Sequence, residues 1–134
     1  MTTDAFFDTN VVVHALVANT SRTARSLALL ANGGTVSVQV LNECASTMRR
    51  KFAASWQQTV RASERLRTIC TVVPVTPDTH VRGLVLAERY QLQLYDGMIV
   101  AAAQLAGCTT LYSEDVHDGL VIDGLTIRNP YAGI

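Results

Sequence analysis

Short apolar runs alternate with helix-like segments along this chain, and that alternation limits the possible folds more than any other feature. Runs at residues 5–7 and 72–73 are short and wholly apolar, and further short strands are expected at residues 109–112 and 125–128. Between them apolar residues recur with helical spacing, as at Ala24, Leu27, Ala28 and Ala31. Apolar strands separated by helices are typical of a parallel sheet covered on both faces. The sequence therefore predicts an α/β protein, with residues 1–134 as a single domain.

Turn and cap residues mark several element boundaries. An Asn-Gly-Gly sequence at residues 32–34 ends one helix, and Thr76-Pro77 begins another as a cap followed by a first-turn proline. Val36 and Val38 alternate with polar neighbours, which predicts a strand that includes both. A helix is expected to follow with one apolar stripe from Val40 to Phe52, and another helix at about residues 56–69.

Composition excludes several classes of protein. Of the 134 residues, 49% are hydrophobic, and no apolar run approaches the ~18 residues that span a bilayer. The N-terminus has no basic segment followed by an apolar one, so we expect a cytoplasmic protein without membrane contact. Cys44, Cys70 and Cys108 are widely spaced, which indicates three buried thiols in place of a zinc site or disulfide framework.

Charge is balanced overall but unevenly distributed. The formal net charge is zero, which argues against tight, purely electrostatic binding to nucleic acid. Arg49, Arg50 and Lys51 nevertheless form a basic run. That run is interpreted either as a solvated helix face or as a set of phosphate contacts.

Four carboxylates, Asp8, Glu43, Asp96 and Asp115, fall at or near expected strand-to-helix junctions. We expect Asp8, Asp96 and Asp115 to emerge at the carboxyl edge of the sheet, where open α/β sheets build their sites. Carboxylates gathered at one edge would repel each other without a cation between them. Oxygen ligands of this kind suit Mg²⁺ or Mn²⁺, so the first hypothesis is a divalent metal used in phosphate chemistry.

Each acid also has a simpler interpretation. Asp8 precedes a helix and is a favoured N-cap residue, Asp96-Gly97 is a strong turn pair, and Asp115 suits an Asx-turn. Glu43 is different because it lies among the apolar residues of a helix, and buried acids are normally paired or metal-bound. An ion pair between Glu43 and an arginine is the alternative to a metal site.

Four blocks of sequence together resemble PIN domains. These blocks are Phe7-Asp8-Thr9-Asn10-Val11, Asn42-Glu43, Tyr95-Asp96-Gly97-Met98-Ile99-Val100-Ala101-Ala102-Ala103 and Leu111-Tyr112-Ser113-Glu114-Asp115. The following tail resembles the end of VapC-type toxin ribonucleases, with Asp115-Val116-His117-Asp118-Gly119, Val121-Ile122-Asp123-Gly124-Leu125 and Asn129-Pro130-Tyr131. The resemblance extends over essentially the whole chain, in order.

This resemblance implies a fold and a function. The fold is a three-layer α/β/α sandwich with a short central parallel sheet. The function is that of a Mg²⁺- or Mn²⁺-dependent endoribonuclease, the toxin of a type II toxin–antitoxin system, which hydrolyses RNA phosphodiesters by metal-activated water. The expected partners are RNA, a cognate antitoxin that covers the acidic groove, and a second copy of the chain in a homodimer.

The resemblance also assigns roles to residues. The catalytic quartet is Asp8, Glu43, Asp96 and Asp115. The three aspartates would hold metal directly, and Glu43 would assist directly or through water. The supporting residues are Thr9 and Asn10, which would orient Asp8, and Ser113, which takes the place of a small hydroxyl residue. Arg49, Arg50 and Lys51 would contact RNA phosphates.

Residues beside the last acid are expected to stay outside the site. Glu114 is expected to be exposed, and His117 and Asp118 are interpreted as surface loop residues.

Two other functions are considered. Asp8-Thr9-Asn10 resembles the first motif of haloacid-dehalogenase-type phosphatases, in which the leading Asp is a nucleophile. That family has a second Asp where this chain has Asn10, and it needs a lysine of which Lys51 is the sole candidate. The second alternative is a non-catalytic RNA- or protein-binding module.

Overall fold

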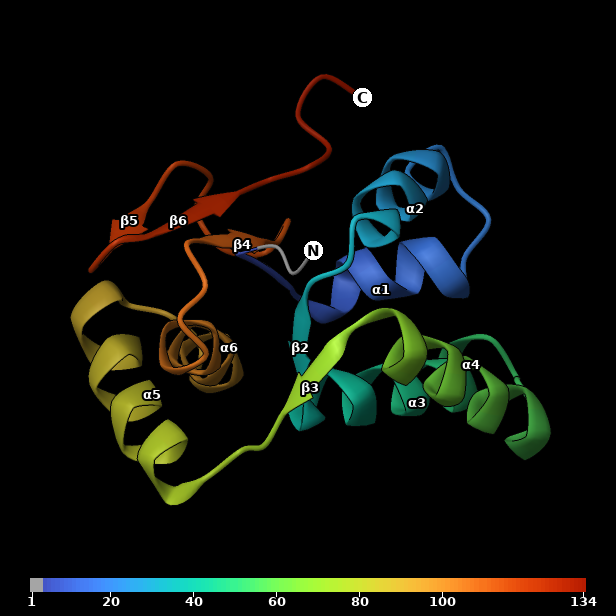
Figure 1. Cartoon of the computed structure of the whole chain (residues 1–134), viewed down its shortest axis with the longest axis horizontal. Helices are drawn as coiled ribbons and strands as arrows, with labels where there is room; N and C mark the ends of the chain where they lie inside the picture. The colour runs from blue at the N-terminus through green and yellow to red at the C-terminus, as the bar shows by residue number, and fades with distance from the viewer. Residues whose placement is uncertain (1–3) are drawn as a thin grey trace.

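The computed structural model describes residues 4–134, which form a six-stranded sheet flanked by helices (Figure 1). The strands are β1 (Ala5–Phe7), β2 (Thr35–Ser37), β3 (Thr71–Val73), β4 (Thr110–Tyr112), β5 (Val121–Ile122) and β6 (Leu125–Arg128). The helices are α1 (Thr9–Leu16), α2 (Thr23–Ala31), α3 (Val38–Lys51), α4 (Trp56–Ile69), α5 (Pro77–Tyr90) and α6 (Leu94–Leu105).

The sheet has the order β3-β2-β1-β4-β6-β5, with all neighbours parallel except β5 and β6. The expected parallel sheet is therefore confirmed, with one antiparallel edge strand that the sequence pattern did not predict. β5 has only two residues, too few for any periodicity to be visible. It pairs with β6 through a tight turn in which Asp123 and Gly124 have φ of 47° and 86°.

Helices cover the sheet in two groups, which confirms the three-layer arrangement. Figure 1 shows α5 and α6 side by side, with the central strands between them and the group formed by α1 to α4. The central strands are buried from both sides, and Phe6, Phe7, Leu111 and Ile127 are all 0% exposed. This burial explains why the strands are short and apolar along their length.

Most predicted helix boundaries are confirmed, and two details are wrong. Thr76 caps α5 by accepting from the Thr79 amide, with proline next to it as expected. The strand expected to include Val38 stops at Ser37, and Val38 is the first residue of α3. Phe52 was expected on the buried stripe of α3. It follows the last turn of that helix and is 44% exposed.

α5 and α6 cross at two glycines. A Cβ at Gly97 would lie 2.6 Å from the Gly83 carbonyl oxygen, and a Cβ at Gly83 would lie 2.4 Å from Met98 Sδ. Neither position has room for a side chain, so the two backbones are in direct contact. Since Asp96 precedes Gly97, this contact fixes where Asp96 lies.

The cysteines and the helix lengths also match expectation. Cys44, Cys70 and Cys108 are buried and form no disulfide with one another. Within residues 4–134, no helix combines the length and apolarity that crossing a membrane requires.

Candidate active site

Two of the predicted acids emerge from neighbouring strands in the middle of the sheet. β1 pairs with β4 so that Phe7 lies opposite Tyr112, and both strands end there. Asp8 follows β1 directly, and its amide donates to the Tyr112 carbonyl at 3.0 Å. β1 has β2 on one side and β4 on the other, so the chain changes direction across the sheet at this point. This is the position at which open α/β sheets form ligand sites.

Asp8 is both a helix cap and a site residue. Its Oδ1 accepts from the Thr9 amide at 2.7 Å, and Oδ2 accepts from the Ser113 hydroxyl at 2.7 Å. The side chain is only 4% exposed. The pKa of Asp8 is raised from 3.8 to about 7, mainly by burial and to a lesser extent by the charges of Asp96 and Asp115, against the lowering effect of the Ser113 and Thr9 donors.

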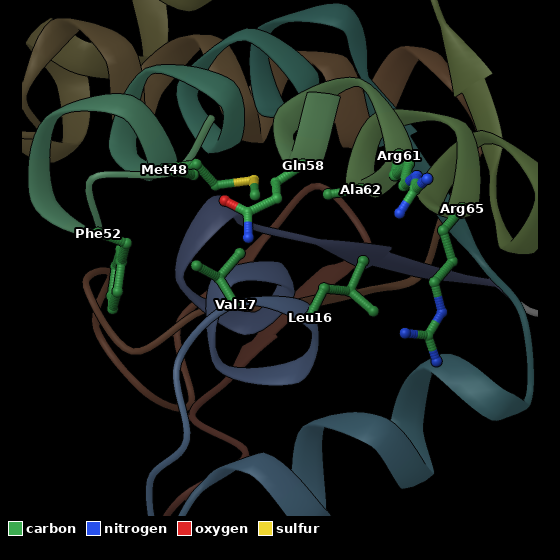
Figure 2. Close-up of a pocket in the computed structure, with 9 residues that line it drawn as sticks. Leu16, Val17, Met48, Phe52, Gln58, Arg61, Ala62 and Arg65 are labelled. Carbon is green, nitrogen blue, oxygen red and sulfur yellow. The ribbon is translucent and has the colours of Figure 1, made fainter. Parts of the chain in front are cut away.

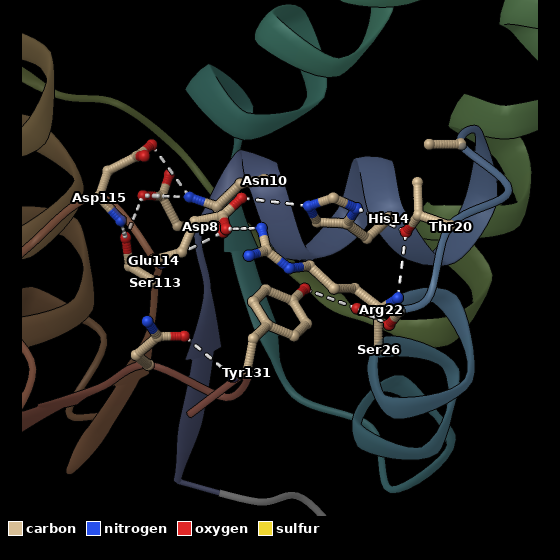
Figure 3. A network of polar contacts seen from close by, with 12 residues as sticks. Asp8, Asn10, His14, Thr20, Arg22, Ser26, Ser113, Glu114, Asp115 and Tyr131 are labelled. Carbon is tan, nitrogen blue, oxygen red and sulfur yellow. Dashed lines mark hydrogen bonds and ion pairs between the residues drawn. The ribbon is translucent and has the colours of Figure 1, made fainter. Parts of the chain in front are cut away.

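Ser113 and Asn10 tie Asp8 to Asp115 (Figure 3). The Ser113 hydroxyl, which donates to Asp8, also accepts from the Asp115 amide at 3.1 Å. Asn10 Nδ2 donates to Asp115 Oδ2 at 3.0 Å and lies 3.5 Å from Asp8 Oδ2. These contacts support the predicted positioning roles of Asn10 and Ser113.

Glu43 is half-buried on α3 and is held by the residue next to Asp8. The Thr9 hydroxyl donates to Glu43 Oε1 at 2.6 Å. Within residues 4–134 no arginine or lysine pairs with Glu43, so the alternative of an arginine ion pair is wrong for the described chain. Thr9 was expected to orient Asp8. Its amide does so, but its side chain positions Glu43.

Gln39 is a positioning residue that the sequence reasoning missed. Its Nε2 lies 3.5 Å from Glu43 Oε2 and donates to the Tyr95 carbonyl at 3.2 Å. It therefore links α3 to the first turn of α6. The available signal was its spacing, because residues four apart on a helix share a face.

Asp96 reaches the site by a different route from the one expected. It was predicted to emerge at the end of a strand, but α6 follows α5 through a short link at residues 91–93. Asp96 is the third residue of α6, where the helix dipole stabilises a negative charge. Partial burial raises its pKa, and so do the charges of Asp115 and Glu43, which indicates that these carboxylates face one another.

The four acids line one pocket together with part of the basic run. Arg50 and Lys51 line the same pocket as Asp8, Glu43, Asp96 and Asp115. Arg49 does not. Its guanidinium lies 4.1 Å from the centre of the Trp56 ring and donates to the Ala54 carbonyl at 2.6 Å. Of the three predicted phosphate contacts, two are therefore placed beside the acids.

Glu114 is not the exposed residue that was expected. It lines the acid pocket, forms an ion pair with Arg22 and a hydrogen bond with His14, whose Nε2 is 3.1 Å from Glu114 Oε1, and its side chain is 21% exposed. Arg22 reaches from α2 and also lies over the Tyr131 ring, 5.1 Å from its centre (Figure 3). The sequence offered no signal for this network because its members are far apart in the chain. His117 and Asp118 are exposed, as expected.

The donor set fits a hydrated divalent cation. Within residues 4–134, no three carboxylate, imidazole or thiol side chains form a ready-made cluster around one point. Mg²⁺ is commonly bound by one or two carboxylates and keeps several waters, so a ready-made cage is not required. The raised pKa values of Asp8 and Asp96 reflect burial and negative charge that a cation would offset.

Comparison with solved structures finds proteins of the same fold. The fold is similar to that of a toxin–antitoxin complex from Klebsiella pneumoniae, with 22% identity, a TM-score of 0.73, and coverage of 95% of this chain and 98% of that one. It is similar to VapC20 of Mycobacterium tuberculosis, a Sarcin-Ricin loop cleaving toxin, with 24% identity, a TM-score of 0.67, and coverage of 83% and 89%. It is also similar to VapBC2 of Rickettsia felis bound to a promoter DNA fragment, with 18% identity, a TM-score of 0.69, and coverage of 96% and 98%.

The sequence comparisons complete the assignment. No curated protein matches the sequence at a significant level. The family model for the PIN domain matches residues 5–117, which is most of the chain. The chain therefore belongs to the PIN domain family.

Proposed function

We propose that this chain is a Mg²⁺- or Mn²⁺-dependent endoribonuclease and the toxin of a toxin–antitoxin pair. The observation that carries the proposal is the meeting of Asp8, Glu43, Asp96 and Asp115, which come from four separate segments, in one pocket. Membership of the PIN family supports nuclease chemistry. The similar structures from Klebsiella pneumoniae and Rickettsia felis contain toxin–antitoxin complexes, and the similar VapC20 cleaves the Sarcin-Ricin loop.

Each acid has a defined part in this proposal. Asp8, Asp96 and Asp115 would hold the ion, and Glu43, held by Thr9, would assist directly or through water. The bound ion would activate a water for attack on phosphorus and stabilise the charge that develops there. Asp8 must lose its proton to bind a cation, and the Ser113 and Thr9 donors favour its ionised form. Asn10 and Ser113 keep Asp8 and Asp115 in a fixed relation.

Basic residues beside the acids would position the RNA. Arg50 and Lys51 line the acid pocket and would contact phosphates on either side of the bond that is cut. Such contacts fix the strand without reading its sequence. Arg49 is engaged with Trp56 and is left out of this role.

The same proposal names the protein partners. An antitoxin with an arginine-bearing segment would pair with the acids, because guanidinium groups bind carboxylates in a bidentate way. The pair would act in the cytoplasm, where RNA is available. A homodimer is supported by α5, which exposes Val81, Leu84 and Val85. Light scattering of the purified chain would test the dimer, and a monomer at all concentrations would contradict it.

Cleavage assays test the acid quartet. Purified protein should cut a labelled RNA with Mg²⁺ or Mn²⁺ and lose activity in EDTA. Asp8→Asn, Asp96→Asn and Asp115→Asn should each abolish cutting. Asp118→Asn, which changes an exposed carboxylate outside the pocket, is the matched control and should remain active. Full, EDTA-sensitive cleavage by Asp8→Asn would rule out the role given to Asp8.

The two alternative functions are less well supported. The phosphatase alternative needs a second Asp at the position of Asn10, and the side chain of Asn10 instead donates to Asp115 Oδ2 at 3.0 Å. A phosphorylated Asp8 trapped with a small phosphate ester would favour the phosphatase. Calorimetry that detects no Mg²⁺ or Mn²⁺ binding, with Glu43→Gln changing only stability, would favour a non-catalytic module.

A further inference from the structure

One face of α3 leads away from the acids and changes charge along its length. From Glu43, residues three, four, seven and eight positions further on share the same face, and they are Ser46, Thr47, Arg50 and Lys51. All of them line the acid pocket. Arg50 Nε donates to Ser46 Oγ at 3.0 Å, so the guanidinium folds back along the helix toward the acids. The acid pocket therefore has a basic side at the C-terminal end of α3.

Phe52 lies where this basic side meets a second groove. It lines the acid pocket and also the groove between the end of α1 and the α3–α4 hairpin. Figure 2 shows Phe52 at one end of that groove and Arg61 and Arg65 toward the other. Leu16, the last residue of α1, and Val17, which follows it, face the hairpin between them. Phe52 thus borders both hollows, and we call the path from the acids past Phe52 to Arg61 and Arg65 the track.

The track carries positive charge and one available aromatic ring. No Asp or Glu occurs between Cys44 and Ser63, although the whole chain has as many acidic as basic residues. Phe52 is 44% exposed. Trp56 is more exposed, but the Arg49 guanidinium lies 4.1 Å from its ring centre and covers one face. Phe52 is therefore the exposed ring on the basic side of the acid pocket, whereas the exposed Tyr95, next to Asp96, borders a different hollow.

These features match single-stranded nucleic acid. Single strands are bound by basic grooves that follow the phosphates and by aromatic rings on which bases stack. The groove beyond Phe52 also has apolar walls, but basic residues on both sides of an exposed ring, next to the acid pocket, are what a nucleic-acid strand uses. A strand whose cleaved bond lies at the acids would pass the basic residues of α3 first, then the Phe52 ring, and then the arginines of α4.

We propose that the RNA strand beside the cleaved bond follows this track. Its phosphates lie against Arg50 and Lys51, one base stacks on Phe52, and the next phosphates reach Arg61 and Arg65. This inference rests on the proposed ribonuclease function and adds a base-stacking subsite to it. The subsite explains how an acidic pocket can still hold a polyanion.

Binding of a labelled, single-stranded 12-nucleotide RNA of mixed sequence tests the track. Affinity is measured with Ca²⁺ in place of Mg²⁺, and a gel verifies that the RNA stays intact. Phe52→Ala should weaken binding roughly 5- to 100-fold, the usual effect of losing one stacked base. Phe52→Leu keeps apolar bulk without a ring and should weaken it similarly, whereas Phe52→Tyr should retain binding. Val60→Ala, at an exposed apolar position outside the track, is the control.

Salt dependence tests the phosphate contacts. Arg50→Ala combined with Lys51→Ala should reduce the slope of log affinity against log salt by about 1.4, which is the value for two contacts to a single strand. Arg67→Ala, at an exposed cation of α4 outside both hollows, should leave affinity unchanged. Circular dichroism checks that each variant is folded.

The outcomes separate this inference from the function on which it rests. If the unmodified chain neither binds nor cuts RNA with Mg²⁺ or Mn²⁺, the proposed function itself fails. If it cuts RNA but Phe52→Ala binds RNA unchanged, the stacking subsite is wrong and the groove is left for a protein partner. Normal RNA binding by Phe52→Leu with weak binding by Phe52→Ala would also overturn stacking, because bulk alone would then suffice.

Discussion

Replacing Asp8 by Asn should stabilise the protein at high pH in EDTA, even though it removes a residue of the site. Asp8 is almost completely buried, and burial raises its pKa from 3.8 to about 7. Folded Asp8 therefore binds its proton more tightly than unfolded Asp8. The free energy of unfolding should fall as pH rises from about 4 to about 7, because folding then requires an ionised carboxylate to be buried.

The magnitude follows from the two pKa values. Raising a carboxyl pKa from 3.8 to about 7 on folding means that the free energy of unfolding is about 4 kcal/mol lower at high pH than at low pH. Between pH 5 and pH 8, ionisation of Asp8 should lower the free energy of unfolding by roughly 2.5 kcal/mol. The amide introduced by Asp8→Asn could still accept from the Thr9 amide with its oxygen, although the Ser113 hydroxyl would lose its acceptor. That loss costs roughly 1 kcal/mol and should not change with pH.

Urea unfolding at pH 5 and pH 8 in EDTA measures this effect. The advantage of Asp8→Asn over the unmodified chain should grow by roughly 2.5 kcal/mol from pH 5 to pH 8. Asp118→Asn, at an exposed carboxylate, controls for the loss of one negative charge. An Asp8→Asn difference that is the same at both pH values would refute the conclusion that burial raises the pKa of Asp8.

Three other features of the structure lead to measurable effects. Mn²⁺ binding at pH 6 should release close to one proton, because Asp8 is mostly protonated at that pH. Calorimetry in two buffers of different ionisation enthalpy measures this release, which should disappear in Asp8→Asn. Equal binding enthalpies in the two buffers would contradict the prediction. Gly97→Ala should lower the melting temperature and the cleavage rate together, with a stability loss of about 1–3 kcal/mol, because its Cβ would meet the Gly83 carbonyl at 2.6 Å. Ser37→Ala should raise stability by about 1 kcal/mol in urea unfolding, since the buried Ser37 hydroxyl has no hydrogen-bond partner within the described residues, and a clear loss would reveal a partner.

The sequence predicted the fold well where burial leaves a pattern. Strands buried on both faces appear as apolar runs, and helices show their spacing and caps, so β1, β4, α4 and α5 could be placed closely. β5 could not be predicted, because a strand of two residues is defined only by its hydrogen bonds to β6. The exposure of Phe52 was not predicted because helical spacing alone does not show at which residue a helix ends.

The residue types of the site were predictable, but not the way they are held. Strand ends placed Asp8 and Asp115 correctly because neighbouring parallel strands bring their ends together. Asp96 was placed at the wrong kind of junction, as its position depends on a contact between two helices instead of on a strand. Hydrogen bonds such as Thr9 to Glu43 join residues 34 positions apart, and no local pattern encodes such a pairing.

The acids are anchored through two sets of contacts, which Thr9 joins by donating its amide to Asp8 and its hydroxyl to Glu43. Asp8 and Asp115 are linked through Ser113, whose hydroxyl donates to Asp8 and accepts from the Asp115 amide, and through Asn10, which donates to Asp115, so both acids belong to the sheet. Glu43 and the first turn of α6, which carries Asp96, are linked through Gln39 and belong to the helices. The position of Asp96 relative to Asp8 and Asp115 therefore depends on how α6 packs against α5 at Gly83 and Gly97. Repacking that contact should move one carboxylate of the candidate site relative to the others without replacing any of the four acids.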